Sequence, residues 1–121
     1  MFQREMDILQ EMANDFSAYK RIIKAIAYGS RVRGDCEGDS DLDVLIIIDK
    51  KDKTLKDKIL DLVYSYELNY DLPFSVTILS LNEYKLNEEL GSPFIKNIKK
   101  EGILFYDSGQ KRKKSAFKAS S

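Results

Sequence analysis

The chain has 121 residues, of which 43% are hydrophobic and 33% charged, the length and composition of one compact domain. It contains no histidine and one cysteine, Cys36, which excludes an intramolecular disulfide, a zinc site built on histidine or cysteine, and a histidine proton shuttle. Twenty basic residues balance twenty acidic ones, but five of the basic residues lie in residues 111–121, which contain no acid. Residues 1–110 therefore carry 15 basic and 20 acidic groups, a net charge of −5. Any metal site must rest on carboxylates, which favour hard cations such as Mg²⁺.

The N-terminal sequence MFQREMDILQEM contains acidic residues and no apolar run long enough for a signal sequence or a membrane span. We therefore expect a cytoplasmic protein that does not associate with membranes. The single cysteine agrees with a reducing compartment.

The first half of the chain predicts one helix and two strands. Apolar residues at three- and four-residue steps predict a helix over about residues 3–19. The β-branched run IIKAIAY, residues 22–28, predicts a buried strand that ends at Gly29 and Ser30. Residues 31–40 are polar and predict a loop, with or without a short helical turn. The continuous apolar run that begins at Leu42 predicts a second strand, over residues 42–48, covered on both faces.

The next segment predicts a helix followed by a strand. Apolar positions between residues 55 and 66 have helical spacing, and Thr54 is the expected N-cap. Pro73 ends any helical pattern and opens PFSVTILS, a third strand.

Two short helices and an edge strand are predicted after residue 80. Ser80 and Glu83 have the spacing of a capping box, and the helix that they begin is expected to run to about residue 90, before Gly91. Ser92 and Pro93 have the pattern of an N-cap and first helical position, and Gly102 ends that helix. The sequence ILFY, residues 103–106, predicts an edge strand.

This order of elements predicts an α+β domain, α/β-like in its alternation, in which helices pack on a small mixed sheet. The expected domain covers residues 1–107, and residues 108–121 form a basic tail expected to be disordered. Seven aromatic residues are expected in the core: Tyr64, Tyr66, Tyr70, Phe74, Phe94, Phe105 and Tyr106.

The sequence GSRVRG, residues 29–34, followed by SDLDV, residues 40–44, carries the most specific chemical pattern. Asp41 and Asp43 are two residues apart at the start of a strand and so project from the same face, where two carboxylates can hold one or two Mg²⁺ ions. Gly29 allows the backbone to approach a phosphate, and Ser30 adds a hydroxyl. Such a pair of motifs can bind the outer phosphates of a nucleotide and bridge them to the aspartates through metal ions.

This arrangement resembles the nucleotidyltransferase superfamily that includes DNA polymerase beta and kanamycin nucleotidyltransferase. Residues 1–106 resemble its minimal nucleotidyltransferases more closely, through GSRVRG, SDLDVLIII and SPFIKNIKKEGILFY. The matching motif positions are Gly29, Ser30, Gly34, Ser40, Asp41 and Asp43.

The resemblance implies the nucleotidyltransferase fold and Mg²⁺-dependent transfer of AMP from ATP to a hydroxyl, with pyrophosphate leaving. It implies that Asp41 and Asp43 are catalytic and hold the metals, and that the nucleotide is bound by Gly29, Ser30, Arg31, Gly34 and Ser40. Small relatives are often paired with a HEPN-domain toxin, which some of them silence by adding AMP to a tyrosine. The implied partner is such a toxin, and the implied role is that of its antitoxin.

One departure from the family pattern leaves a second interpretation open. The family places a third carboxylate in the strand after the long helix, where this chain has Ser75. Asp71 is the nearest acidic residue and a candidate replacement. The alternative is a catalytically degenerate binding module that neutralises its partner by contact. Transfer to a small molecule is a further possibility, although the chain lacks the additional domain with which such relatives hold their acceptor.

Several other residues can be interpreted as structural or as functional. Arg31 and Arg33 are either surface charges or phosphate ligands. We expect an accidental or structural role for Cys36, since no base is identifiable near it. For the basic tail we favour a solubilising role over direct contact with nucleic acid.

Overall fold

The computed structural model describes residues 3–34 and 40–109. In chain order the helices and strands are α1 (Gln3–Phe16), β1 (Ile22–Tyr28), α2 (Ser30–Arg33), β2 (Leu42–Ile48), α3 (Lys53–Tyr70), β3 (Phe74–Ser80), α4 (Leu81–Glu89), α5 (Pro93–Glu101) and β4 (Ile103–Asp107).

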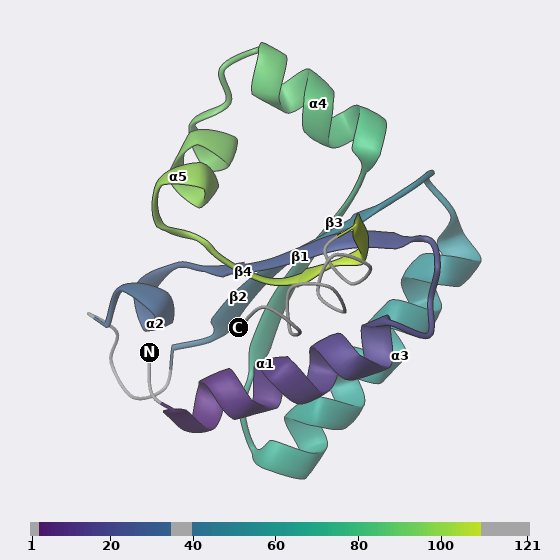
Figure 1. The fold of residues 1–121 in the computed structure, drawn as a ribbon. Coiled ribbons are helices and arrows are strands. Elements are labelled where there is room, and N and C mark those ends of the chain that lie inside the picture. Colours follow the sequence, from purple (N-terminus) through teal and green to yellow (C-terminus); the bar gives the residue numbers. More distant parts are fainter. Residues whose placement is uncertain (1–2, 35–39, 110–121) are drawn as a thin grey trace, which may run out of the picture.

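The four strands form one mixed sheet in the order β3-β2-β1-β4 (Figure 1). Strand β1 is antiparallel to β2 and to β4, and β2 is parallel to β3. A parallel pair needs a crossover connection, which α3 supplies. The predicted mixed sheet with packed helices is confirmed, as is the position of residues 103–106 in an edge strand.

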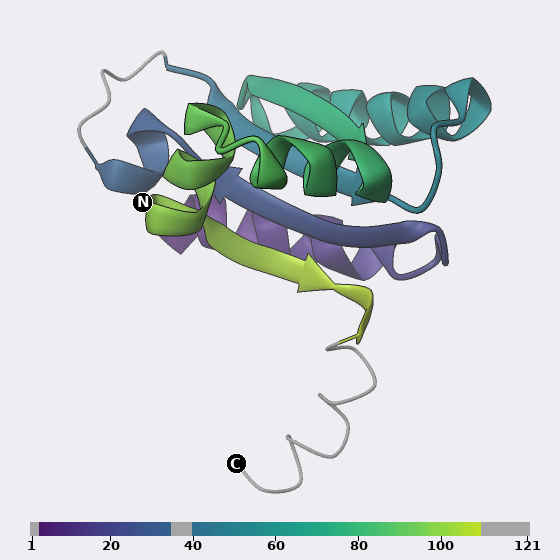
Figure 2. The ribbon, with the colours of Figure 1, turned by 90° about the horizontal axis from the view of Figure 1, so that it is seen from above.

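Helices cover both faces of this sheet (Figures 1 and 2). On one face, α1 and α3 pack against alternate residues of β2, namely Val44, Ile46 and Ile48. On the other face, Ile98 of α5 and Tyr84 of α4 pack with Leu45 and Ile47. The predicted burial of β2 on both faces is therefore confirmed, and its uninterrupted apolar run follows from that burial.

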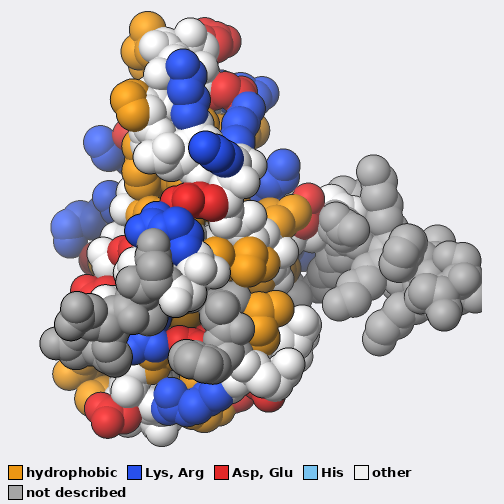
Figure 3. All heavy atoms as spheres, turned by 90° about the vertical axis from the view of Figure 1, so that its left-hand side faces the viewer, with side chains coloured by type: hydrophobic (Ala, Val, Ile, Leu, Met, Phe, Trp, Pro, Cys, Tyr) orange, Lys and Arg blue, Asp and Glu red, His pale blue; other side chains and the backbone are white. Residues whose placement is uncertain are grey.

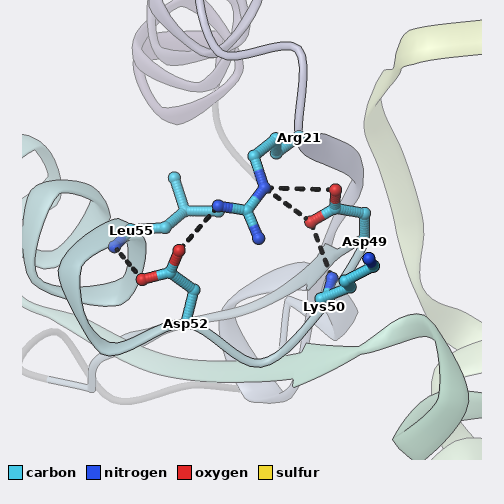
Figure 4. A network of polar contacts seen from close by, with 5 residues as sticks. All are labelled: Arg21, Asp49, Lys50, Asp52 and Leu55. Atoms are coloured by element: carbon cyan, nitrogen blue, oxygen red, sulfur yellow. Dashed lines mark hydrogen bonds and ion pairs between the residues drawn. The ribbon is translucent and has the colours of Figure 1, made fainter.

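Helix α3 begins two residues earlier than the sequence indicated. The N-cap is Asp52, not Thr54: its carboxylate accepts a hydrogen bond from the amide of Leu55. Arg21, at the start of the sheet, donates to Asp52 at 2.6 Å and to Asp49 at 2.9 Å (Figure 4). This contact between distant segments holds the Asp52 side chain in the capping position, which the sequence around residue 54 does not reveal.

Other boundaries differ by a few residues. Helix α1 ends at Phe16 rather than near residue 19, and β3 begins at Phe74 rather than Pro73. The capping box of Ser80 and Glu83 is present in full. Ser92 occupies the expected N-cap position of α5 but makes no side-chain capping bond there.

The predicted aromatic core is largely confirmed. Tyr66, Phe74 and Tyr106 are buried, and Tyr70, Phe94 and Phe105 are half-buried. The prediction is wrong for Tyr64, which is 59% exposed. The buried stripe of α3 consists of Leu55, Ile59, Val63 and Tyr66, and Tyr64 projects away from it.

Two sequence-based predictions concern residues outside the described ranges. One is about Cys36, and the other is about the basic tail, of which residues 110–121 lie outside. Within the described ranges, none of the helices has both the length and the apolar character needed to cross a membrane.

Candidate active site

The turn after β1 brings the chain off the sheet and directly into α2. Gly29 has φ of 88°, a backbone conformation that glycine adopts without the steric cost of a Cβ. Gly34 closes α2 with φ of 83°, and its amide donates to the carbonyl of Ser30 at 2.9 Å. The predicted motif GSRVRG is thus one helical turn with a glycine of positive φ at each end.

The two aspartates lie at the start of β2. Asp41 directly precedes the strand and is exposed, while Asp43 is half-buried within it. Asp43 is paired in register with Tyr28 of β1 and with Ser75 of β3. Because side chains alternate along a strand, Asp43 shares the face of Leu45 and Ile47, which α4 and α5 cover farther along.

Gly29 and Asp43 are in close contact. A Cβ added to Gly29 would lie 2.1 Å from Oδ2 of Asp43, well inside any permitted separation. A Cβ added to Gly34 would meet nothing within 4 Å. The missing side chain of Gly29 is therefore what allows the Asp43 carboxylate to lie against the turn, and the two predicted motifs meet at this point.

The environment of Asp43 disfavours its negative charge. Burial raises the pKa of Asp43, and the neighbouring carboxylate of Asp41 raises it further. A hydrogen bond with Ser75 and the positive charge of Arg33 offset part of this effect. Two carboxylates that repel each other at a partly buried position form a site that a cation would stabilise.

The donors present fit a hard divalent cation held by two carboxylates. Asp41 and Asp43 supply carboxylate oxygens, and Ser75 supplies a hydroxyl beside them. In residues 3–34 and 40–109, no three histidine, cysteine, aspartate or glutamate side chains gather as a possible metal site. Asp71 ends α3 in a left-handed conformation with φ of 50° and does not join the two aspartates.

Arg31 and Ser40 lie close to each other beside the aspartates. The guanidinium of Arg31 donates to the backbone carbonyl of Ser40 and pairs with Glu5 of α1. Arg33 has a different partner, Glu101 of α5, at 2.8 Å. The two arginines of the motif therefore connect α2 to two different helices.

Three residues of the site were missed by sequence reasoning. The Tyr28 hydroxyl shares a hydrogen bond with Thr77, and burial, followed by the charge of Asp43, raises the pKa of Tyr28. The Tyr28 ring packs edge-on against Phe94 of α5, with ring centroids 5.5 Å apart. Tyr28 directly precedes Gly29, and Thr77 shares the strand face of Ser75, so both positions carried a weak signal. Glu5 is 26 residues from Arg31 in sequence, and its position carried no such signal.

Basic side chains gather above this end of the sheet. Figure 3 shows the face that carries α2, with Lys and Arg side chains over α4 and α5 in its upper part. On α5 the lysines are Lys96, Lys99 and Lys100, all exposed. Lys99 is paired with Glu88 of α4, and the positive charge of Lys96 and Lys100 can attract anions such as nucleotide phosphates to this face.

Comparison with known proteins identifies the family that the sequence motifs resemble. The family model "Polymerase beta, Nucleotidyltransferase" matches residues 10–111. The chain is 32% identical over 102 residues to the "Putative protein adenylyltransferase MJ0141" of Methanocaldococcus jannaschii, covering 81% of this chain and 95% of the relative. It is also 32% identical over 104 residues to "Putative protein adenylyltransferase MJ0604" of the same organism, covering 84% of this chain and 98% of that relative.

Solved structures share the fold at low sequence identity. A "putative nucleotidyltransferase" from Sulfolobus solfataricus matches with a TM-score of 0.54 at 18% identity, over 86% of this chain and 81% of that one. A chain of a crystal structure of a toxin-antitoxin with AMP-PNP matches with a TM-score of 0.54 at 16% identity, over 93% of this chain and 82% of that one.

The family match, over residues 10–111, covers most of the chain and confirms the resemblance of the motifs. This chain therefore belongs to the polymerase beta nucleotidyltransferase family.

Proposed function

We propose that this nucleotidyltransferase transfers AMP from ATP to a hydroxyl of a partner protein, a tyrosine of a HEPN-domain toxin, and so acts as its antitoxin. The observation that carries the proposal is the contact between Gly29 and Asp43, which joins a phosphate-binding turn to a pair of carboxylates. The reaction belongs in the cytoplasm, where ATP is available.

In the proposed reaction, Gly29, Ser30, Gly34 and Ser40 surround the phosphates of ATP, and Asp41 and Asp43 hold two Mg²⁺ ions. Bound Mg²⁺ neutralises charge on the phosphates and favours ionisation of the attacking hydroxyl. The hydroxyl oxygen forms a bond with the α-phosphorus, and the bond from that phosphorus to the bridging oxygen breaks. Pyrophosphate leaves with the electron pair, and the hydroxyl proton passes to water.

The choice of a protein acceptor is supported by the two relatives in Methanocaldococcus jannaschii, which are named as protein adenylyltransferases. The antitoxin role is supported by the structural neighbour, which comes from a toxin-antitoxin crystal structure with AMP-PNP. The HEPN partner and its tyrosine follow from the resemblance to minimal nucleotidyltransferases.

The test is a labelling reaction with ATP that carries the label on the α-phosphate. The purified protein, Mg²⁺ and the product of the adjacent gene are incubated together, and the labelled residue is identified by mass spectrometry. We expect label on a tyrosine of the neighbour and none with the Asp41→Ala/Asp43→Ala double variant. No transfer by the wild type, or equal transfer by the double variant, would overturn the proposal.

A second candidate is a module that neutralises its partner by contact alone. The position of Ser75 beside Asp43, where the family pattern has an acid, favours this alternative. It predicts that Asp41→Asn leaves inhibition of the partner intact. If that variant still forms the complex but no longer inhibits the partner, inhibition depends on the enzyme.

A further inference from the structure

A buried ion pair connects α1 to the turn of the candidate site. Glu5 and Arg31 are 26 residues apart in sequence, and their side chains are 5% and 12% exposed, respectively. Within the described part of the chain, Glu5 and Ser80 are the two buried polar residues. Removing one member of such a pair leaves a charge buried without its counterion, so the pair strongly restrains both side chains.

The same guanidinium connects the two halves of the site. Arg31 directly follows Ser30, and its Nε donates to the carbonyl of Ser40, the residue before Asp41. A guanidinium is planar and its donors have fixed directions, so two acceptors define its orientation. Glu5 fixes the guanidinium from α1, and the guanidinium in turn fixes the backbone at residue 40 relative to residue 30.

We propose that Arg31, oriented by Glu5, is a positioning residue that sets the place of Asp41 and Asp43 relative to Ser30, and that it is not a ligand of the phosphates. This inference rests on the proposed function for its catalytic consequence, whereas the restraint itself is a property of the fold. A displacement of reacting groups by about 1 Å can lower a rate by roughly 100-fold. A helix that takes no direct part in the site thereby controls its geometry.

The environments of the two arginines support this division of roles. The Nε of Arg31 donates to Ser40 and its Nη1 pairs with Glu5, and the Arg31 side chain is only 12% exposed, which leaves little of it accessible to a phosphate. The Arg33 side chain is 43% exposed, and its charge acts on Asp43. Arg33 can therefore meet a ligand without breaking a buried ion pair.

The test compares Glu5→Gln, Arg31→Gln, the double variant and the milder Arg31→Lys with the wild type. Arg21→Gln serves as the matched control, because Arg21 binds Asp49 and Asp52 at the opposite end of the sheet (Figure 4). Three quantities are measured: amide hydrogen exchange of residues 40–43, affinity for ATP by calorimetry, and kcat for AMP transfer. Exchange and affinity are measurable whether or not transfer occurs, so failure of the proposed function is recognised separately.

We expect Glu5→Gln and Arg31→Gln each to speed exchange at residues 40–43 by about tenfold or more, with no change there in Arg21→Gln. We expect kcat to fall about 100-fold in both, the affinity for ATP to change less than about threefold, and the double variant to be no worse than either single one. Arg31→Lys should retain part of the activity.

Two results would overturn the inference. The first is unchanged exchange at residues 40–43 in Glu5→Gln. The second is a large loss of ATP affinity in Arg31→Gln together with normal affinity and kcat in Glu5→Gln, which identifies Arg31 as a direct phosphate ligand.

Discussion

The carboxylate of Asp43 occupies the space that a side chain on Gly29 would need, since a Cβ there would lie 2.1 Å from its Oδ2. Gly29 directly follows β1, and Asp43 lies in β2, where it is paired with Tyr28, the last residue of β1. The antiparallel register of the two strands produces this contact. The turn of residues 29–34 and the Asp43 carboxylate therefore meet at one place.

This contact predicts different effects for two glycine substitutions. Gly29→Ala and Gly34→Ala both place a Cβ at positive φ. Gly34 is in the left-handed helical region, where a Cβ costs roughly 1–2 kcal/mol, whereas Gly29, with φ of 88° and ψ of −166°, is in a region that essentially only glycine adopts. Only Gly29→Ala also displaces the Asp43 carboxylate. We expect Gly29→Ala to lose more unfolding free energy than Gly34→Ala in urea titrations and to lose AMP transfer. Equal losses in the two variants would contradict the contact.

A third carboxylate at residue 75 should strengthen cation binding. Ser75 is paired with Asp43 in register, so Ser75→Asp adds a negative charge directly beside it. We expect a lower Tm without metal because of repulsion, a larger rise in Tm with Mg²⁺ than in the wild type, and transfer about tenfold faster. Ser75→Asn is the uncharged control. If Mg²⁺ raises the Tm of Ser75→Asp no more than that of Ser75→Asn, the aspartates do not hold the metal.

The raised pKa of Asp43 predicts a pH-dependent cost to stability. The folded state holds this proton more tightly than the unfolded chain, so the cost begins as pH rises past the ordinary value of 3.8 and is complete above the raised pKa. We expect Asp43→Asn, measured without divalent cations, to exceed the wild type in Tm at neutral pH. The difference should narrow as pH falls toward 3.8.

Thermal unfolding between about pH 3 and pH 7 measures this difference. Asp41→Asn is the companion variant, because removing its charge lowers the pKa of Asp43, which makes the cost smaller and lets it reach its full value at lower pH. A Tm difference between Asp43→Asn and the wild type that stays constant with pH would show that burial of the Asp43 charge is not its source.

The cap of α3 makes a prediction that separates two neighbouring residues. Asp52 accepts from Leu55 and pairs with Arg21, which together hold the pKa of Asp52 below its usual range, Arg21 having the larger effect. We expect Asp52→Ala to lower Tm at neutral pH and Thr54→Ala to change stability by less than about 0.5 kcal/mol.

The Asp52 contribution is present above the ordinary pKa of 3.8 and disappears as pH falls through the lowered value. The difference in Tm between the wild type and Asp52→Ala should therefore shrink in acid. A larger loss in Thr54→Ala than in Asp52→Ala at neutral pH would restore Thr54 as the cap.

Elements with strong local signals were predicted to within a residue. Strands β1 and β2 have the predicted bounds because each is an apolar, β-branched run bordered by polar or glycine-containing sequence. The start of α3 was wrong because its cap depends on Arg21, 31 residues away from Asp52. Tyr64 was predicted in the core because its side chain is aromatic. Whether that side chain points toward the sheet or toward solvent depends on how the whole of α3 packs.

The sequence by itself determined the site residue types, their order and the family, because glycine, serine and aspartate at that spacing in a strand-turn-strand setting are a specific pattern. Only the tertiary structure decided that Asp43 contacts Gly29, that Tyr28 reaches Thr77 and that Glu5 holds Arg31. These relationships depend on the strand register and on which helix covers which face. Both are set by burial of apolar surface among residues far apart in the chain, and no local pattern specifies them.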